Sequence, residues 1–184
     1  MSHRLVVLQG PSAAGKSTLQ AKLGLPRIVT WTSRSPREGE AHGREYYFGS
    51  PDQLRGMYAS GELLEITEYQ GNVYGTSMAS VVAAIQDATP YSVVLDASGA
   101  RKVKERFRDQ VLLVGVYAEK DQCARRLAER GLPQEEQERR LAGYEEEVRH
   151  LFGCDLIIPN RDQQLDQAAY FIEAIGISLT EPWD

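Results

Sequence analysis

A lysine and a hydroxyl group close a glycine-containing loop near the start of the chain, and side chains in this pattern could hold phosphate groups. The loop matches G-x-x-x-x-G-K-[ST] in full and directly follows the apolar run Leu5–Leu8. Glycines let successive backbone N–H groups turn toward an anion, and the following helix directs its positive end to the same place. Lys16 would reach the β- and γ-phosphates, and the Ser17 hydroxyl would bind Mg²⁺. The residues expected to contact a nucleoside triphosphate are Gly10, Pro11, Ser12, Ala13, Ala14, Gly15, Lys16, Ser17 and Thr18.

A pair of arginines further along the chain could hold a second phosphate. Arg34 and Arg37 are three residues apart, with Pro36 stiffening the loop between them. Two guanidinium groups in this arrangement form a fork that suits a phosphate monoester. The same segment also fits an exposed polar loop whose arginines pair with Glu38 and Glu40, and taken alone it does not decide between the two interpretations.

The elements that must position these groups alternate between strand and helix. Apolar runs without polar alternation, typical of strands covered on both faces, occur at 4–8, 91–95, 111–117 and 155–158. Helical patterns lie at 16–23, 99–107, 119–130, 134–151 and 162–175. This alternation predicts an α/β fold with a central parallel sheet flanked by helices. Ligands of such sheets bind at the carboxyl ends of the strands, where the phosphate loop begins.

The segment 30–77 interrupts this alternation with many glycines, two prolines and short alternating stretches such as 62–69. It is typical of a small β-rich insertion with turns. We therefore expect a single domain over 1–184, with a core of 1–29 and 78–184 and an insertion at about 30–77. A short charged hairpin at about 131–137 forms a candidate lid.

Composition narrows the classes of function. The chain has 184 residues and a net charge of −5, which argues against a nucleic-acid partner. No apolar run approaches the length of a membrane span, so no membrane partner is expected. Cys123 and Cys154 lie far apart without metal-ligand spacing, which favours packing roles and a reducing, cytoplasmic compartment. The partners expected are therefore small molecules, and the chain itself is expected to be a monomer or homodimer.

Three segments after the phosphate loop carry a family resemblance. Thr32–Glu40 is similar to T-T-R-x-x-R-x-G-E, Gly61–Glu65 to G-E-[FL]-[LI]-E, and Gly71–Ser77 to G-x-x-Y-G-[TS]. In this order they closely resemble the guanylate kinases among the nucleoside monophosphate kinases, over about residues 4–175. The resemblance implies a P-loop kinase fold in which the insertion binds GMP and the lid closes over ATP. It also implies Mg²⁺ as the cofactor that accompanies ATP.

The resemblance implies a role for each matching residue of the insertion. Glu65 would accept hydrogen bonds from guanine N1 and N2, Thr76 would donate one to O6, and Ser33 would assist. The residues implied to hold the 5′-phosphate of GMP are Arg34, Arg37, Tyr46 and Tyr74. Guanine presents two adjacent donors beside an acceptor, so a fixed carboxylate next to a hydroxyl can distinguish it from adenine.

Beyond the insertion, Arg126, Arg130 and Arg140 also match the family. The candidates for contacting the transferring phosphoryl group are Lys16, Arg34, Arg126, Arg130 and Arg140, and Asn160 stands where the family has an asparagine beside the adenine. Arg125, Arg139 and the run Glu145–Glu147 are interpreted as a solvated helix face.

The chain departs from the family at the end of its third strand. The family has an acidic D-x-D or E-x-D there, followed by Q-G, whereas this chain has Leu95–Arg101. Either Ser98 replaces the second acid, or two residues are missing and Asp96 stands alone to orient Mg²⁺ waters or the guanine amine. The segment Leu19–Arg27 is also shorter than usual, which predicts a short first helix.

The function implied is phosphoryl transfer from ATP to GMP or dGMP, giving ADP and GDP. One alternative is a ribose 1,5-bisphosphate phosphokinase, because those enzymes share the fold and end their third strand in a Ser-containing turn. The other is a non-catalytic guanylate-kinase-like module that binds peptides. Such modules typically lose the phosphate loop, which is intact here.

Overall fold

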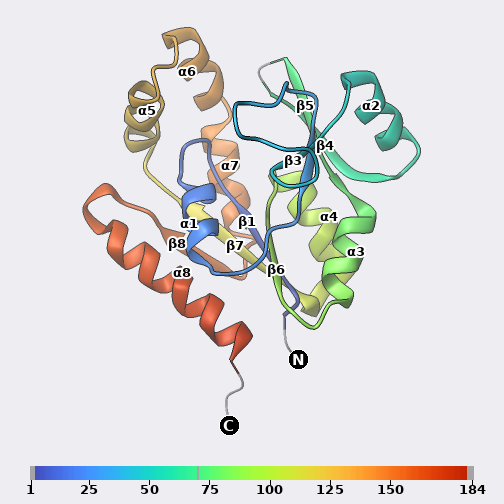
Figure 1. Ribbon diagram of the computed structural model, residues 1–184. Coiled ribbons are helices and arrows are strands. Elements are labelled where there is room, and N and C mark those ends of the chain that lie inside the picture. Colours follow the sequence, from blue (N-terminus) through green and yellow to red (C-terminus); the bar gives the residue numbers. More distant parts are fainter. Residues whose placement is uncertain (1–2, 70, 182–184) are drawn as a thin grey trace.

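The computed structural model describes residues 3–69 and 71–181, so the ends of the predicted domain (1–2 and 182–184) and residue 70 lie outside the described residues. Its central sheet consists of four parallel strands in the order β6-β1-β7-β8 (Figure 1). Their bounds are β1 Leu5–Gln9, β6 Tyr91–Val94, β7 Val111–Tyr117 and β8 Leu156–Pro159. The predicted α/β class and parallel sheet are confirmed.

Helices cover both faces of this sheet because its strands are apolar on both sides. In β1, Val6 and Leu8 pack into one hydrophobic cluster, while Leu5 and Val7 pack into another. The first cluster is covered by α1 (Lys16–Lys22), α5 (Lys120–Glu129) and α8 (Leu165–Thr180). The second is covered by α3 (Met78–Gln86) and α4 (Ala97–Phe107). The seven residues of α1 agree with the short first helix predicted from the sequence.

A second, mixed sheet in the order β3-β2-β5-β4 lies between residues 30 and 77. Its strands are β2 Thr30–Thr32, β3 Tyr46–Phe48, β4 Leu63–Tyr69 and β5 Asn72–Ser77. It packs on α2 (Pro51–Ala59) through a small core of Leu54, Leu63 and Val73. The sequence analysis did not include α2, although Ser50 caps it by accepting a hydrogen bond from the Gln53 N–H at 3.1 Å.

The helical segment predicted at 134–151 is divided in the structure. It forms α6 (Gln134–Leu141) and α7 (Tyr144–Leu151), separated by Ala142 and Gly143. A tight turn with Gly131 at φ +71° joins α5 to α6, so the segment predicted as a hairpin is a turn followed by a helix. Two short 3₁₀ segments are also present: Arg108–Gln110 precedes β7, and Asp162–Gln164 precedes α8.

Both cysteines are free thiols within the fold. Cys123 is buried, and the Cys154 Sγ accepts a hydrogen bond from Gln9 Nε2 at 2.8 Å. Among residues 3–69 and 71–181, no cluster of three or more histidine, cysteine or acidic side chains could hold a metal ion. Within the same residues, every helix is too short or too polar to cross a membrane.

Candidate active site

The loop between β1 and α1 requires glycine at two positions. Gly10 has φ +141° and Gly15 has φ +99°, in the region that side chains rarely adopt. A Cβ on Gly10 would run into the Val116 carbonyl oxygen, and one on Gly15 would run into the side-chain amide of Asn160. The loop is therefore pressed against the ends of β7 and β8, with its open side toward the carboxyl edge of the sheet.

Lys16 is turned toward the start of the same loop. Its ammonium donates hydrogen bonds to the carbonyl oxygens of Gly10 at 2.6 Å and Pro11 at 2.8 Å. Burial lowers the pKa of Lys16, and the nearby Glu147 carboxylate opposes that shift. A buried ammonium surrounded mainly by neutral carbonyls would gain from an anionic partner such as a phosphate.

Two predicted residues support the loop from behind. Asn160 is buried and donates its side-chain amide to the Ala14 carbonyl at 2.7 Å. Arg126 donates from Nη1 to the carbonyls of Ala13 and Ala14, at 3.2 and 3.3 Å. Its Nε and Nη2 donate to the Asp162 carboxylate at 3.0 and 2.6 Å. With its N–H groups used in this way, Arg126 braces the phosphate loop.

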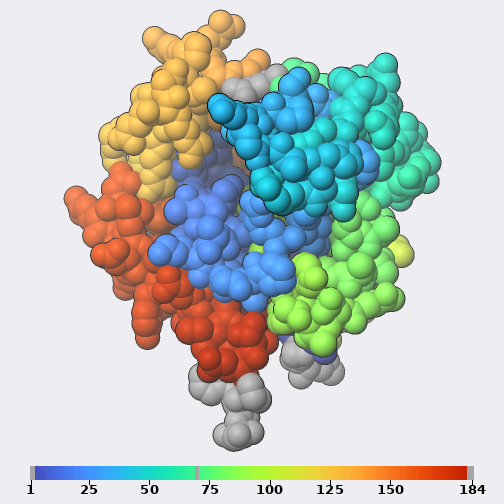
Figure 2. Space-filling view, in the orientation of Figure 1, coloured from blue at the N-terminus to red at the C-terminus, as the bar shows by residue number. Residues whose placement is uncertain are grey.

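A cavity of about 500 Å³ runs from the phosphate loop to the second sheet. Figure 2 shows the hollow between the α5–α6 segment and the residues of the second sheet. The predicted residues that line it are Gly10, Ser12, Ala13, Gly15, Lys16, Ser17, Thr18, Tyr46, Glu65, Tyr74, Thr76, Asp96, Arg130 and Arg140. Residues predicted for the two nucleotides thus share one cleft. The predicted residues outside this lining are Pro11, Ala14, Ser33, Arg34, Arg37, Arg126 and Asn160.

Glu65 lies on the floor of the cleft, at the second sheet. It pairs in register with Thr76 across β4 and β5 and is only 7% exposed. Burial raises the pKa of Glu65 to about 7, a hydrogen bond from Thr76 opposes this, and the charge of Asp96 adds to it. A Cβ on Gly99 would lie 2.6 Å from the Glu65 Cγ, so the start of α4 leaves room for this side chain.

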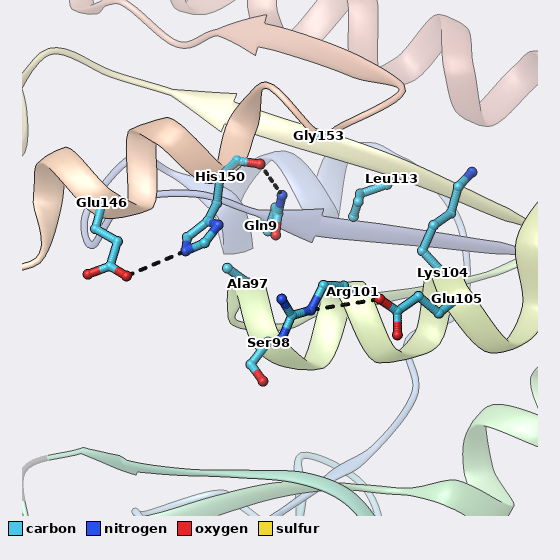
Figure 3. A pocket seen from close by; sticks show the side chains of 10 residues that line it. All are labelled: Gln9, Ala97, Ser98, Arg101, Lys104, Glu105, Leu113, Glu146, His150 and Gly153. Carbon is cyan, nitrogen blue, oxygen red and sulfur yellow. Dashed lines mark hydrogen bonds and ion pairs between the residues drawn. The ribbon is translucent and has the colours of Figure 1, made fainter.

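Asp96 lies between β6 and α4, and the Thr67 hydroxyl contacts both its carboxylate and that of Glu65. Asp96 caps α4 by accepting the Gly99 N–H at 2.7 Å, and its second oxygen accepts the hydroxyl of Thr67. Ser98, the alternative acid replacement, lines a different cavity of about 430 Å³ between α4 and α7 (Figure 3). Asp96 therefore lines the cleft, whereas Ser98 lies outside its lining.

The loop that follows β2 carries Arg34 and Arg37, and Glu40 of the same loop accepts hydrogen bonds from both residues. Arg34 Nη2 lies 3.0 Å from both carboxylate oxygens of Glu40, and its guanidinium stacks 5.6 Å from the centre of the Tyr46 ring. Arg37 is exposed, and its backbone N–H donates to Glu40 at 2.8 Å. The Ser33 hydroxyl accepts the Val73 N–H at 2.8 Å. Arg34 therefore pairs with Glu40, as the polar-loop interpretation proposed, while it lies against a tyrosine of the cleft.

Comparison with known proteins identifies the family. The family model described as guanylate kinase matches residues 2–175. The chain is 39% identical to the guanylate kinase of Streptomyces coelicolor, over 79% of this chain and 77% of that protein. It is 33% identical to that of Dechloromonas aromatica, over 97% and 93%. The chain belongs to the guanylate kinase family. The crystal structure of guanylate kinase from Anaplasma phagocytophilum shares the fold, with a TM-score of 0.72 and 24% identity over 98% of this chain and 88% of that one.

In this member of the guanylate kinase family, the α5–α6 segment brings two arginines to the cleft. Arg130 lies at the end of α5, and Arg140 lies in the last turn of α6. The Arg140 Nε donates to a Glu136 carboxylate oxygen at 2.8 Å, and both side chains are largely buried. The ion pair fixes Arg140 at the wall of the cleft.

Two acids that line the cleft of this guanylate kinase were not among the residues predicted from the sequence, Glu45 and Glu147. Glu147 was assigned to a solvated run, yet it lines the cleft, and its Oε2 accepts the Ser12 N–H of the phosphate loop at 3.3 Å. Burial raises the pKa of Glu147, and Lys16 opposes the shift. A helical signal was present, because Glu147 lies three residues after Tyr144 and four before Leu151, and both of these are buried.

Proposed function

We propose that the protein transfers the γ-phosphoryl group of ATP to the 5′-phosphate of GMP or dGMP, giving ADP and GDP. This is a reaction of purine nucleotide metabolism. The observation that carries the proposal is a single cleft lined at one end by the phosphate loop and at the other by Glu65 and Thr76. Membership of the guanylate kinase family supports the same reaction and disfavours a ribose 1,5-bisphosphate kinase and a peptide-binding module.

At the donor end, backbone N–H groups of the loop and Lys16 would hold the phosphates of ATP. Phosphoryl transfer spreads negative charge over the oxygens of the moving group, so nearby cations stabilise its transition state. Arg130 and Arg140 line the cleft and supply such charge. Arg126 and Asn160 act on the donor through the loop carbonyls that they hold.

The residues at the donor end also fit Mg²⁺. This ion prefers oxygen ligands, keeps several waters, and is usually bound through one or two protein oxygens plus the phosphates of the nucleotide. Ser17 lines the cleft with an exposed side chain, and the carboxylates of Glu147 and Asp96 line the same cavity. We propose Ser17 as the direct ligand, with an acid acting through water. Bound there, the ion would neutralise charge on the β- and γ-phosphates.

At the acceptor end, the Glu65 carboxylate would accept the N1 and N2 hydrogens of guanine, and the Thr76 hydroxyl would donate to O6. Asp96, beside Glu65, offers a second acceptor for the amine. An adenine in this site would leave buried polar groups unpaired, at about 1–3 kcal/mol each. The residues proposed to hold the GMP phosphate are Arg34, Arg37, Tyr46 and Tyr74, and Ser33 is proposed to assist Glu65 and Thr76 at the base.

The chemistry itself requires little from the protein beyond positioning. A phosphate monoester is already largely dianionic near neutral pH, so we propose no general base. Rate acceleration would come from holding the two phosphates in line and from excluding water when the second sheet and the α5–α6 segment approach each other. The turn at 131–133 and the following helix are the proposed lid. Two free cysteines fit the reducing cytoplasm.

An assay of ADP release tests the proposal. Purified protein is supplied with Mg²⁺ and ATP, and with GMP, dGMP, AMP, UMP or ribose 1,5-bisphosphate as the acceptor. We expect ADP release to depend on GMP or dGMP, and Lys16→Ala to lower turnover about 100-fold or more without unfolding the protein. Release that depends on ribose 1,5-bisphosphate instead would establish the sugar-phosphate kinase. No release with any acceptor would favour the binding module.

A further inference from the structure

One acid of the cleft is bonded to the phosphate loop itself. Glu147 reaches the loop from α7, and its Oε2 accepts the Ser12 N–H at 3.3 Å. Lys16 and Arg140 line the same cavity, and Lys16 lies near enough to Glu147 for the two charges to interact. A carboxylate therefore occupies a position among the groups proposed to receive a triphosphate, where a negative charge opposes the binding of another anion.

The other acids that line the cleft form their hydrogen bonds away from the phosphate loop, although Asp96 lies near enough for its charge to act on Glu147. Glu65 belongs to the purine end, and Asp96 accepts hydrogen bonds from Thr67 and Gly99 beside it. Glu45 accepts the Arg44 Nε at 2.6 Å and the Ala41 N–H at 2.8 Å. Of the described acids that line the cavity, Glu147 is thus the one joined to the donor site.

A carboxylate in a triphosphate site can favour binding when the triphosphate is bound to Mg²⁺. Between a carboxylate and an uncompensated triphosphate the interaction is repulsive, and burial strengthens it. When Mg²⁺ accompanies the phosphates, its waters are strong hydrogen-bond donors that a carboxylate can accept, and acids in this outer position raise metal affinity. The same carboxylate then opposes binding of the metal-free nucleotide and favours binding of its Mg²⁺ complex.

We propose that Glu147 makes the donor site selective for the Mg²⁺ complex of ATP over metal-free ATP. The inference rests on the proposed function, because it takes ATP as the donor. It assigns to Glu147 the water-mediated contact that the sequence analysis gave to Asp96. Glu147 is a specificity-determining residue that acts through the charge of its carboxylate.

The chain offers a matched pair of variants. Glu147→Gln keeps the size of the side chain and an acceptor for the Ser12 N–H, so it removes the charge alone. Glu146→Gln removes a neighbouring charge that points away from the nucleotide. Figure 3 shows Glu146 directed at His150, 3.8 Å away, on the wall of the second cavity.

Calorimetry with a non-hydrolysable ATP analogue tests the proposal without catalysis. Dissociation constants are measured with excess chelator and with Mg²⁺, for the wild type and both variants. We expect the ratio of the metal-free to the Mg²⁺ constant to fall about tenfold or more in Glu147→Gln. Metal-free analogue should bind this variant more tightly than it binds the wild type. Glu146→Gln should keep the wild-type ratio, and all three proteins should melt at similar temperatures.

The outcomes separate the inference from the function on which it rests. If both forms of the analogue bind and Glu147→Gln keeps the wild-type ratio, the role of Glu147 is refuted while ATP remains the donor. An equal change of this ratio in Glu146→Gln would also refute the role of Glu147, since the loss of any nearby negative charge would then have the same effect. If neither form binds the wild type, ATP is not the donor and both proposals fall together.

Discussion

At the scale of single residues, the end of the cleft that we propose binds the purine holds a carboxylate in surroundings that disfavour its charge. Glu65 is largely buried and lies near Asp96, so its ionised form is disfavoured by lost hydration and by a like charge. Thr76 and Thr67 offset part of this by donating hydrogen bonds to it. A guanine with two N–H donors would add further hydrogen bonds that stabilise the charged carboxylate. Strain of this kind is typical of binding sites.

The raised pKa of Glu65 predicts that the ionised carboxylate, which guanine binding needs, destabilises the ligand-free protein. The folded-state pKa is about 7 against a usual value of 4.5, so between these pH values the folded state holds the proton more tightly. The free energy of unfolding should therefore fall as pH rises from about 4.5 to 7. Glu65→Gln abolishes this loss, so we expect it to stabilise the ligand-free protein at pH 8 by up to about 3 kcal/mol. Denaturant unfolding at pH 5 and pH 8 measures the effect.

The same variant should bind GMP poorly while its KM for ATP changes little. In the wild type, the KM for GMP should rise as pH falls below 7, because protonation removes the acceptor that guanine needs. The KM for ATP, measured in the same series, is the control. Equal changes in both constants would show that Glu65 does not read the base.

At the scale of elements, the phosphate loop is held in place by parts that lie far apart in the sequence. Arg126 extends from α5 to the carbonyls of Ala13 and Ala14, while its Nη2 donates to the Asn160 carbonyl at 2.8 Å, just after β8. Asp162 fixes the guanidinium from the other side. One side chain thus ties a helix, the end of a strand and the loop into a single unit.

This arrangement predicts that Arg126 acts on the donor by positioning the loop. We expect Arg126→Ala to raise the KM for ATP about tenfold or more, with little change in the KM for GMP. Thermal melting should show a loss of stability, because the loop carbonyls and Asp162 each lose one of their hydrogen bonds. Arg125→Ala is the matched control, since Arg125 shares Asp162 but is mostly exposed. A uniform fall in kcat with both KM values unchanged would instead indicate direct contact with the transferring group.

At the scale of the whole molecule, the sequence predicts those features that a short stretch of neighbouring residues determines. The phosphate loop, the buried strands and the paired Glu65 and Thr76 each depend on neighbouring residue types or on short motifs. The parallel sheet followed from strands without polar alternation, which both hydrophobic clusters explain.

Other features depended on contacts between distant segments, which a pattern does not contain. The charged run that includes Glu147 is typical of a solvated face, and only packing of α7 against the loop brings that carboxylate into the cleft. The helices α2 and α3 were missed because glycine-rich and β-like segments surround them. The helix at 134–151 divides at Ala142 and Gly143, since glycine disfavours a continuous helix.

The central claim at this scale is that both nucleotides occupy one cleft, with the donor and acceptor phosphates facing each other between the core and the second sheet. The most direct measurement is inhibition by a bisubstrate molecule in which adenosine and guanosine are joined through a pentaphosphate. The account predicts competition with ATP and also with GMP, and binding tighter than that of either nucleotide alone. Competition with only one of the two would contradict it, because separate sites would then hold donor and acceptor.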